Sequence, residues 1–155
     1  MRKPIPIMAA IVLFACAPAR AQDGRAPQPY ELTARGVIAA AAGDAYQQAI
    51  ESCYRGKPGD APQGPQFLAC LKKGYRAESD ALARAYDGTL AALKTLPDRG
   101  AKLRNAQGAW TKFRDANCSF ARAVAPQENA DESFYDCLLR ATIERRIELR
   151  SLVGD

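Results

Sequence analysis

The chain has 155 residues, of which 22 are basic and 17 are acidic, and it contains no histidine. This length is enough for one domain with its own hydrophobic core. The absence of histidine argues against most zinc sites and against histidine-based acid-base catalysis, so we expect no catalytic residue, no metal and no cofactor.

The first 21 residues have the pattern of a secretory signal peptide. A basic start at Arg2 and Lys3 is followed by a mostly apolar stretch and by the small-x-small sequence Ala-Arg-Ala at residues 19–21. The stretch is too short and wrongly flanked for a membrane-spanning helix. We therefore expect residues 1–21 to be removed and the protein to be periplasmic or secreted.

A lipoprotein signal is the alternative, because residues 13–16 loosely match a lipobox that would leave an acylated Cys16 as a lipid anchor. The bulky Phe14 and the position of Pro18 favour ordinary cleavage. Residues 1–21 carry three basic residues and no acid, so after their removal the exported chain has 19 basic and 17 acidic residues. That near balance gives no clustered positive surface, and nucleic-acid binding is not expected.

The domain begins after a short lead-in. Residues 22–30 contain Asp-Gly and Pro-Gln-Pro sequences, which predict disorder ahead of a helical domain at residues 31–155. An alanine-rich sequence predicts a first helix at about residues 31–54. Residues 56–65 then hold three glycines and three prolines, which predict a loop.

Three further helices follow this loop. Apolar spacings of three, four or seven predict a helix at about residues 66–96 with Pro65 at its start. Pro97 should end it, and Asp98 should cap a third helix that runs to about residue 123. Residues 129–132 have the spacing of a capping box for a last helix that reaches about Val153. The expected apolar stripes are Phe67, Leu71, Tyr75, Leu82, Tyr86, Leu93 and Leu96, then Leu103, Ala106, Trp110, Phe113, Asn117, Phe120 and Val124, and lastly Phe134, Tyr135, Leu138, Leu139, Leu149 and Leu152.

No segment alternates with a period of two, so the sequence predicts an all-α fold: a small antiparallel bundle of three or four helices. Four cysteines remain after the leader, namely Cys53, Cys70, Cys118 and Cys137. An even number in an exported chain indicates disulfides, with three pairings open. We prefer Cys53–Cys70 and Cys118–Cys137, which join neighbouring helix ends and would each stabilise the fold by roughly 3 kcal/mol.

One face of the third helix is unusual. Gln107, Trp110, Arg114 and Cys118 fall at i, i+3, i+7 and i+11, so an aromatic ring, a guanidinium and a thiol share it. Such a face either anchors the core or presents a binding site. The structural interpretation, which we favour, makes Trp110 a core residue.

The two arginines near this face have the same two interpretations. A structural Arg114 would bond to Asp115, to Asp136 or to a carbonyl at a helix end, and Arg145 points inward in the same way from the last helix. Gln107 and Asn117 would then complete a polar network that specifies helix register. The functional interpretation makes Gln107, Trp110, Arg114, Asp115 and Arg145 part of a binding surface.

These residues resemble a known pattern. Leu-x-x-Ala-Gln-x-x-Trp at residues 103–110, Phe-Arg-Asp-x-x-Cys at 113–118, Cys137, and Thr-x-x-Arg-x-x-x-Leu at 142–149 are similar to the lysozyme inhibitor LprI-like family. The resemblance covers about residues 50–153. It implies an exported helical domain and, for the member that names the family, inhibition of lysozyme.

Three functions follow as hypotheses. The first is an exported, non-catalytic envelope protein that binds a protein partner such as a lysozyme, with the acidic run Glu128, Asp131, Glu132 and Asp136 as a contact for a basic partner. The second is an envelope scaffold protein that does not bind lysozyme. The third is a glycan-acting enzyme that uses an Asp/Glu pair, which we disfavour because no pattern places two carboxylates together.

Overall fold

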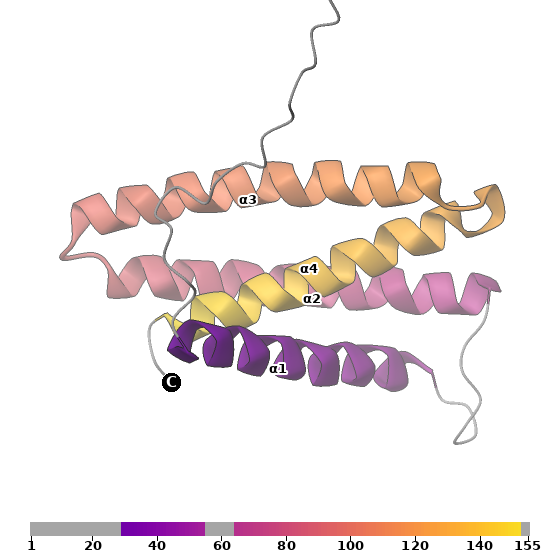
Figure 1. Ribbon diagram of the computed structural model, residues 1–155, viewed down its shortest axis with the longest axis horizontal. Helices are drawn as coiled ribbons and strands as arrows, with labels where there is room; N and C mark the ends of the chain where they lie inside the picture. The colour runs from indigo at the N-terminus through magenta and orange to yellow at the C-terminus, as the bar shows by residue number, and fades with distance from the viewer. Residues whose placement is uncertain (1–28, 55–63, 153–155) are drawn as a thin grey trace, which may run out of the picture.

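The structure is a computed structural model that describes residues 29–54 and 64–152, with side chains from residue 36 onward (Figure 1). The predicted leader with Cys16, nearly all of the lead-in and most of the 56–65 loop lie outside the described residues. The described part contains four α-helices, one 3-10 turn and no strand. Their bounds are α1 (Pro29–Cys53), α2 (Gly64–Ala92), α3 (Pro97–Val124), η1 (Gln127–Asn129) and α4 (Ala130–Ser151). The all-α prediction is confirmed.

Two predictions about helix ends were wrong. Leu96 is the residue before α3, Pro97 lies in the first turn, and Asp98 is acidic in that turn but does not cap it through its side chain. Asn129 precedes α4 without a side-chain capping bond, so the predicted capping box does not form. Proline at a helix start needs no N–H partner, and acidic side chains in a first turn still favour the helix dipole.

Helix α4 lies at the centre of the bundle. It packs most extensively against α2, then against α3, and then against α1. Consecutive helices run antiparallel, so α2 and α4 run in the same direction (Figure 1). The cross-helix contacts Tyr75–Tyr135, Glu78–Arg146 and Thr89–Leu149 follow that shared direction along the two helices.

The core divides into two clusters along α4. The cluster nearer its start joins α1, α2 and α4 and consists of Ala42, Tyr46, Ile50, Cys70, Leu71, Leu139 and Ile143. The cluster nearer its end joins α2, α3 and α4 through Leu82, Leu103 and Leu149, with Trp110 packed against it. Because α4 faces three helices, its buried face is broader than a simple amphipathic stripe.

A glycine allows α2 and α4 to approach closely. A Cβ at the buried Gly74 would lie 3.2 Å from Leu139 Cδ2 and 3.6 Å from the Cβ of Ala49. By contrast, a Cβ at Gly88, in the same helix, would meet nothing within 4 Å. Gly74 therefore occupies the point where α1, α2 and α4 meet.

Both predicted disulfides are present. Cys53–Cys70 joins the end of α1 to α2 with the Cα atoms 5.5 Å apart, and Cys118–Cys137 joins α3 to α4 at 5.4 Å. Because consecutive helices alternate in direction, both lie toward the same end of the bundle, the one at which α1 and α3 finish (Figure 1).

The predicted stripe of α3 was largely wrong. Phe113, Phe120 and Val124 are 66, 66 and 64% exposed, and Ala106 and Asn117 are exposed as well. The face that turns inward carries Gly100, Leu103 and Cys118. Helix α3 packs mainly on α4, and its disulfide fixes Cys118 inward. The face of α3 that turns toward α4 is therefore the polar one, which contains Gln107 and Arg114. Leu152, predicted inward on the last helix, is 63% exposed.

The contrast between the two α2 glycines gives a stability prediction. We expect Gly74→Leu to lower the free energy of unfolding by about 1–3 kcal/mol or more, because the side chain overlaps Leu139. Gly88→Leu is the matched control, and it should stabilise the helix by up to about 1 kcal/mol because leucine is the better helix former. Chemical denaturation of both variants measures this, and equal effects would contradict the close approach.

Candidate functional site

Two guanidinium groups lie near the ring of Trp110. The Arg114 Cζ is 4.9 Å from the centre of the Trp110 ring, and the Arg145 Cζ is 5.9 Å from it. Arg114 also lies 5.9 Å from the ring of Tyr75 on α2. The cluster spans α2, α3 and α4, and cation–π attraction favours this arrangement over isolated buried charges.

Arg145 is the most buried charged residue of the cluster, with 8% of its surface exposed. Its Nε donates to Gln107 Oε1 at 2.9 Å, and its Nη1 donates to Glu148 Oε2 at 2.7 Å. A buried guanidinium needs such acceptors, because desolvation disfavours its charge. The predicted inward position of Arg145 and its link to Gln107 are present.

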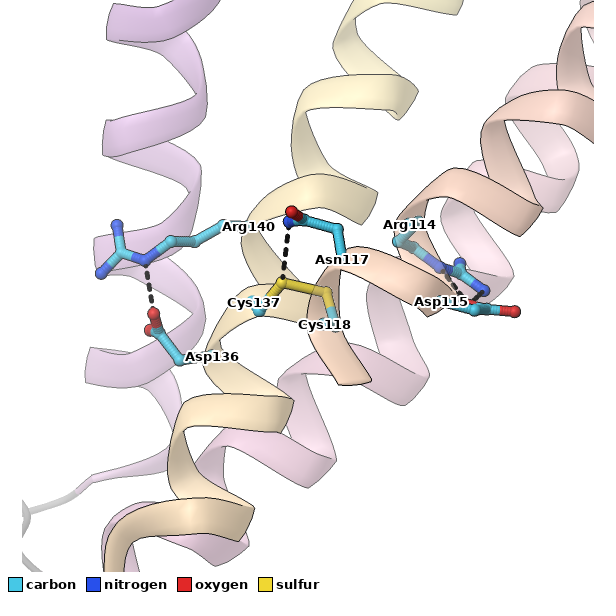
Figure 2. The surroundings of a disulfide bond; sticks show 7 residues. All are labelled: Arg114, Asp115, Asn117, Cys118, Asp136, Cys137 and Arg140. Carbon is cyan, nitrogen blue, oxygen red and sulfur yellow. Dashed lines mark hydrogen bonds and ion pairs between the residues drawn. A yellow bond between two sulfur atoms is a disulfide. The ribbon is translucent and has the colours of Figure 1, made fainter. Parts of the chain in front are cut away.

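Arg114 takes the first of the partners predicted for it. Its Nε and Nη2 both donate to Asp115 Oδ1, at 2.9 and 2.7 Å (Figure 2). Asn117 does not join the arginines, because its Nδ2 donates at 3.7 Å to Cys137 Sγ, beside the disulfide. The structure thus brings Gln107, Trp110, Arg114 and Arg145 together and directs Asn117 elsewhere.

The predicted acidic run divides into two parts. Asp136 turns toward α1, where Tyr46 donates its hydroxyl to Oδ1 at 2.5 Å and Arg140 donates Nε to Oδ2 at 2.8 Å. The Arg140 guanidinium lies 3.8 Å from the centre of the Tyr46 ring. Burial, and then the hydrogen bond to the Asp136 carboxylate, raise the pKa of Tyr46 to about 12. Asp136 therefore attaches α1 to α4.

The other acidic residues form a corner between α3 and α4. Glu128 lies in η1 and is exposed, while Asp131 and Glu132 occupy the first turn of α4 and are partly exposed. Asp131 pairs with Arg122 of α3 at 2.7 Å. We call these three residues the acidic corner; the Cys118–Cys137 disulfide braces the two helices that it connects.

A further ion pair, between α4 and α2, was not predicted. Arg146 Nε donates to Glu78 Oε2 at 2.5 Å, and both side chains are mostly buried between α4 and α2. The pair lines a groove of about 350 Å³ together with residues of α1 and α2, including Gly74. The sequence could have indicated this pair only through a charged residue on the buried face of α4. The extent of that face depends on the tertiary contacts, so the sequence did not show it.

A second groove, of about 300 Å³, is lined by Ile38, Ala39, Glu144 and Glu148. It contains two carboxylates, which is the feature that would favour a glycan-acting enzyme. They stand one turn apart on α4, however, and Glu148 is bonded to Arg145. They do not flank a substrate from opposite sides, as the two carboxyl groups of a glycosidase do.

The described residues form neither a metal-ligand set nor a membrane-spanning helix. Within residues 29–54 and 64–152, no three side chains of the metal-binding types come together as a ligand set. In the same part of the chain, no helix combines the length and the hydrophobicity that crossing a membrane requires.

Comparison with known proteins gives one finding. The sequence profile described as lysozyme inhibitor LprI matches residues 55–149, which include α2, α3 and most of α4. Helix α1 lies before the matched region. Neither a curated protein nor a solved structure matches the chain.

Tyr46 gives a prediction about pH. Because its pKa in the fold is raised from 10.0 to about 12, the stability that this contact contributes is complete below pH 10 and is lost as the pH rises toward 12. An absorbance titration of the six tyrosines should show one late ionisation. Tyr46→Phe should remove that component and the associated fall in stability, whereas an unchanged titration would contradict the contact.

Arg145 gives a prediction about the polar cluster. We expect Arg145→Leu to cost about 2 kcal/mol, because it leaves the Gln107 carbonyl without its donor inside the bundle. Fluorescence of Trp110, the single tryptophan, should shift as the guanidinium leaves its surroundings. Exposed Arg150 on the same helix is the control, and Arg150→Leu should change stability by no more than about 0.5 kcal/mol. Equal stabilities would instead indicate that Arg145 has no structural role.

Proposed function

The chain belongs to the lysozyme inhibitor LprI family, and on this premise we propose that it is an exported, non-catalytic envelope protein that binds and inhibits a lysozyme-type glycosidase. The observation that carries the proposal is the extent of the family match. The match includes Gln107, Trp110, Arg114 and Arg145, which we call the tryptophan–arginine motif, and both cysteines of the Cys118–Cys137 pair. Disulfides persist in oxidising compartments, which supports export.

The proposed contact surface is not the motif itself. The side chains of Gln107, Arg114 and Arg145 already bond within the molecule, and Arg145 is buried. A partner that used these groups would have to break those bonds. We therefore assign the motif a structural role: it holds α3 on α4 in the register that the disulfide requires.

We assign the contact to the acidic corner. Glu128 lies in the short connection between α3 and α4, and Glu132 lies in the first turn of α4. A disulfide joins these two helices, so little conformational entropy is lost on binding. Exported residues carry a net charge of about +2, so long-range steering toward a basic lysozyme has to come from a local patch of acid. The acidic corner is such a patch on the described surface.

The test is lysozyme turnover on cell-wall substrate with the purified, oxidised protein. We expect inhibition at micromolar protein, and we expect Glu128→Lys/Glu132→Lys to weaken it at least about tenfold by removing the favourable contact. Asp80→Lys/Asp87→Lys on α2 makes the same charge change at exposed positions away from the corner, and it should inhibit like the unaltered protein.

Two outcomes would count against this function. Absence of inhibition by the unaltered protein at micromolar concentration would remove the lysozyme proposal and leave the envelope scaffold as the remaining hypothesis. Equal losses in both double variants would point to overall charge rather than to the acidic corner.

A further inference from the structure

The outer face of α3 carries an uncharged apolar stripe. Residues 106, 113 and 120 recur every seven positions, as do 109, 116 and 123, and they are Ala, Phe and Phe in the first series and alanine throughout the second. All six are exposed, with Phe113 and Phe120 at 66%. This is the a and d pattern of a helix that packs against another helix.

The stripe is distinct from the face that packs in the fold. Among the described residues, α3 contacts mainly α4, through the side that carries Leu103 and Cys118. Figure 1 shows α3 at the edge of the bundle, so that its far side faces away from α1, α2 and α4. Val124 at 64% exposure extends the apolar surface to the end of the helix. Such a surface, about 27 Å long over 18 residues, is typical of an interaction site.

We propose that two copies of this chain associate through this stripe, with their α3 helices antiparallel about a two-fold axis. In such a pair an a position of one helix meets a d position of the other. Setting Phe113 of each copy against Ala116 of the other also sets Phe120 against Ala109, and Ala106 against Ala123. Every phenylalanine then packs on an alanine, so the stripe is complementary to itself in size.

Charge selects the antiparallel direction over the parallel one. Arg99 and Lys102 continue the same face one heptad before Ala106 and Ala109, respectively. A parallel pair would place the four cations of two copies side by side and would stack phenylalanine on phenylalanine next to alanine on alanine. The antiparallel pair places the cations of the two copies at opposite ends. It also pairs each phenylalanine with an alanine, so that the layers that contain phenylalanine are alike in size.

The surface is large enough for a weak dimer. At 66% exposure each phenylalanine offers roughly 130 Å² of surface. With Val124 and the alanines, the stripe would bury on the order of 500 Å² per copy, or about 1,000 Å² in the pair, which is the lower limit for a specific interface. We therefore expect association in the micromolar range.

The experiment measures the mass of the purified, oxidised full chain in solution as its concentration rises. We expect a reversible dimer for the unaltered protein. Phe113→Lys places two lysines near the two-fold axis and Ala116→Glu places two glutamates there, so each variant alone should dimerise at least about tenfold more weakly. An equal mixture should recover a heterodimer, because Lys at 113 then faces Glu at 116 and the second Phe–Ala contact is intact.

A second mixture, Phe120→Lys with Ala109→Glu, distinguishes the antiparallel register from a parallel one. The antiparallel pair sets these two charges against each other, whereas a parallel pair leaves them eleven residues, or about 16 Å, apart along the helix. Circular dichroism checks that each variant folds. Val37→Lys, an equally exposed apolar residue on α1, is the control and should leave the dimer unchanged. A monomer at about 100 µM, or a dimer that the stripe variants do not weaken, would overturn the proposal. Lysozyme takes no part in this measurement, so the result is independent of the proposed function.

Discussion

The fold depends on the close packing of α4 against three helices. Gly74 lets α2 approach Leu139, and around that point α4 also contacts α1 through Tyr46 and α3 through the Cys118–Cys137 bond. A helix in that position exposes little of its surface to water. Each charged residue on it must either reach the rim or find a partner inside, and this requirement explains the polar contacts of the bundle.

Those contacts explain what the tryptophan–arginine motif does. Arg145 would be unfavourable between helices by itself, and it is accommodated by Gln107, Glu148 and the face of Trp110. Arg114 covers the same ring and bonds to Asp115. Because the Arg145–Gln107 bond joins α4 to α3 and forms in only one register of the two helices, we propose that the motif specifies an arrangement rather than a chemical activity. This is why we place the proposed lysozyme contact elsewhere.

Because one face of α3 packs against the bundle, the opposite face is exposed to other molecules. A helix at the edge of a bundle that packs mainly on one neighbour buries about one side, and on α3 that side includes the polar residues Gln107 and Arg114. The apolar stripe with Phe113 and Phe120 is therefore presented outward, although it has the stronger hydrophobic periodicity. The proposed dimer follows from this orientation of α3.

The sequence by itself determined the helical class, the approximate helix bounds and the grouping of Gln107, Trp110 and Arg114 on one face, because periodicity and helix breakers are local properties. It left three cysteine pairings open and favoured the one that the structure shows. It could not decide which of the two faces of α3 packs inward, since either an apolar stripe or a polar face with a cysteine satisfies a helical pattern. Tertiary structure decided this through the disulfide to Cys137 and the buried Arg145. The Glu78–Arg146 and Tyr46–Asp136 contacts were equally inaccessible to sequence reasoning, because they join residues 68 and 90 positions apart on helices whose mutual rotation only the packed core fixes.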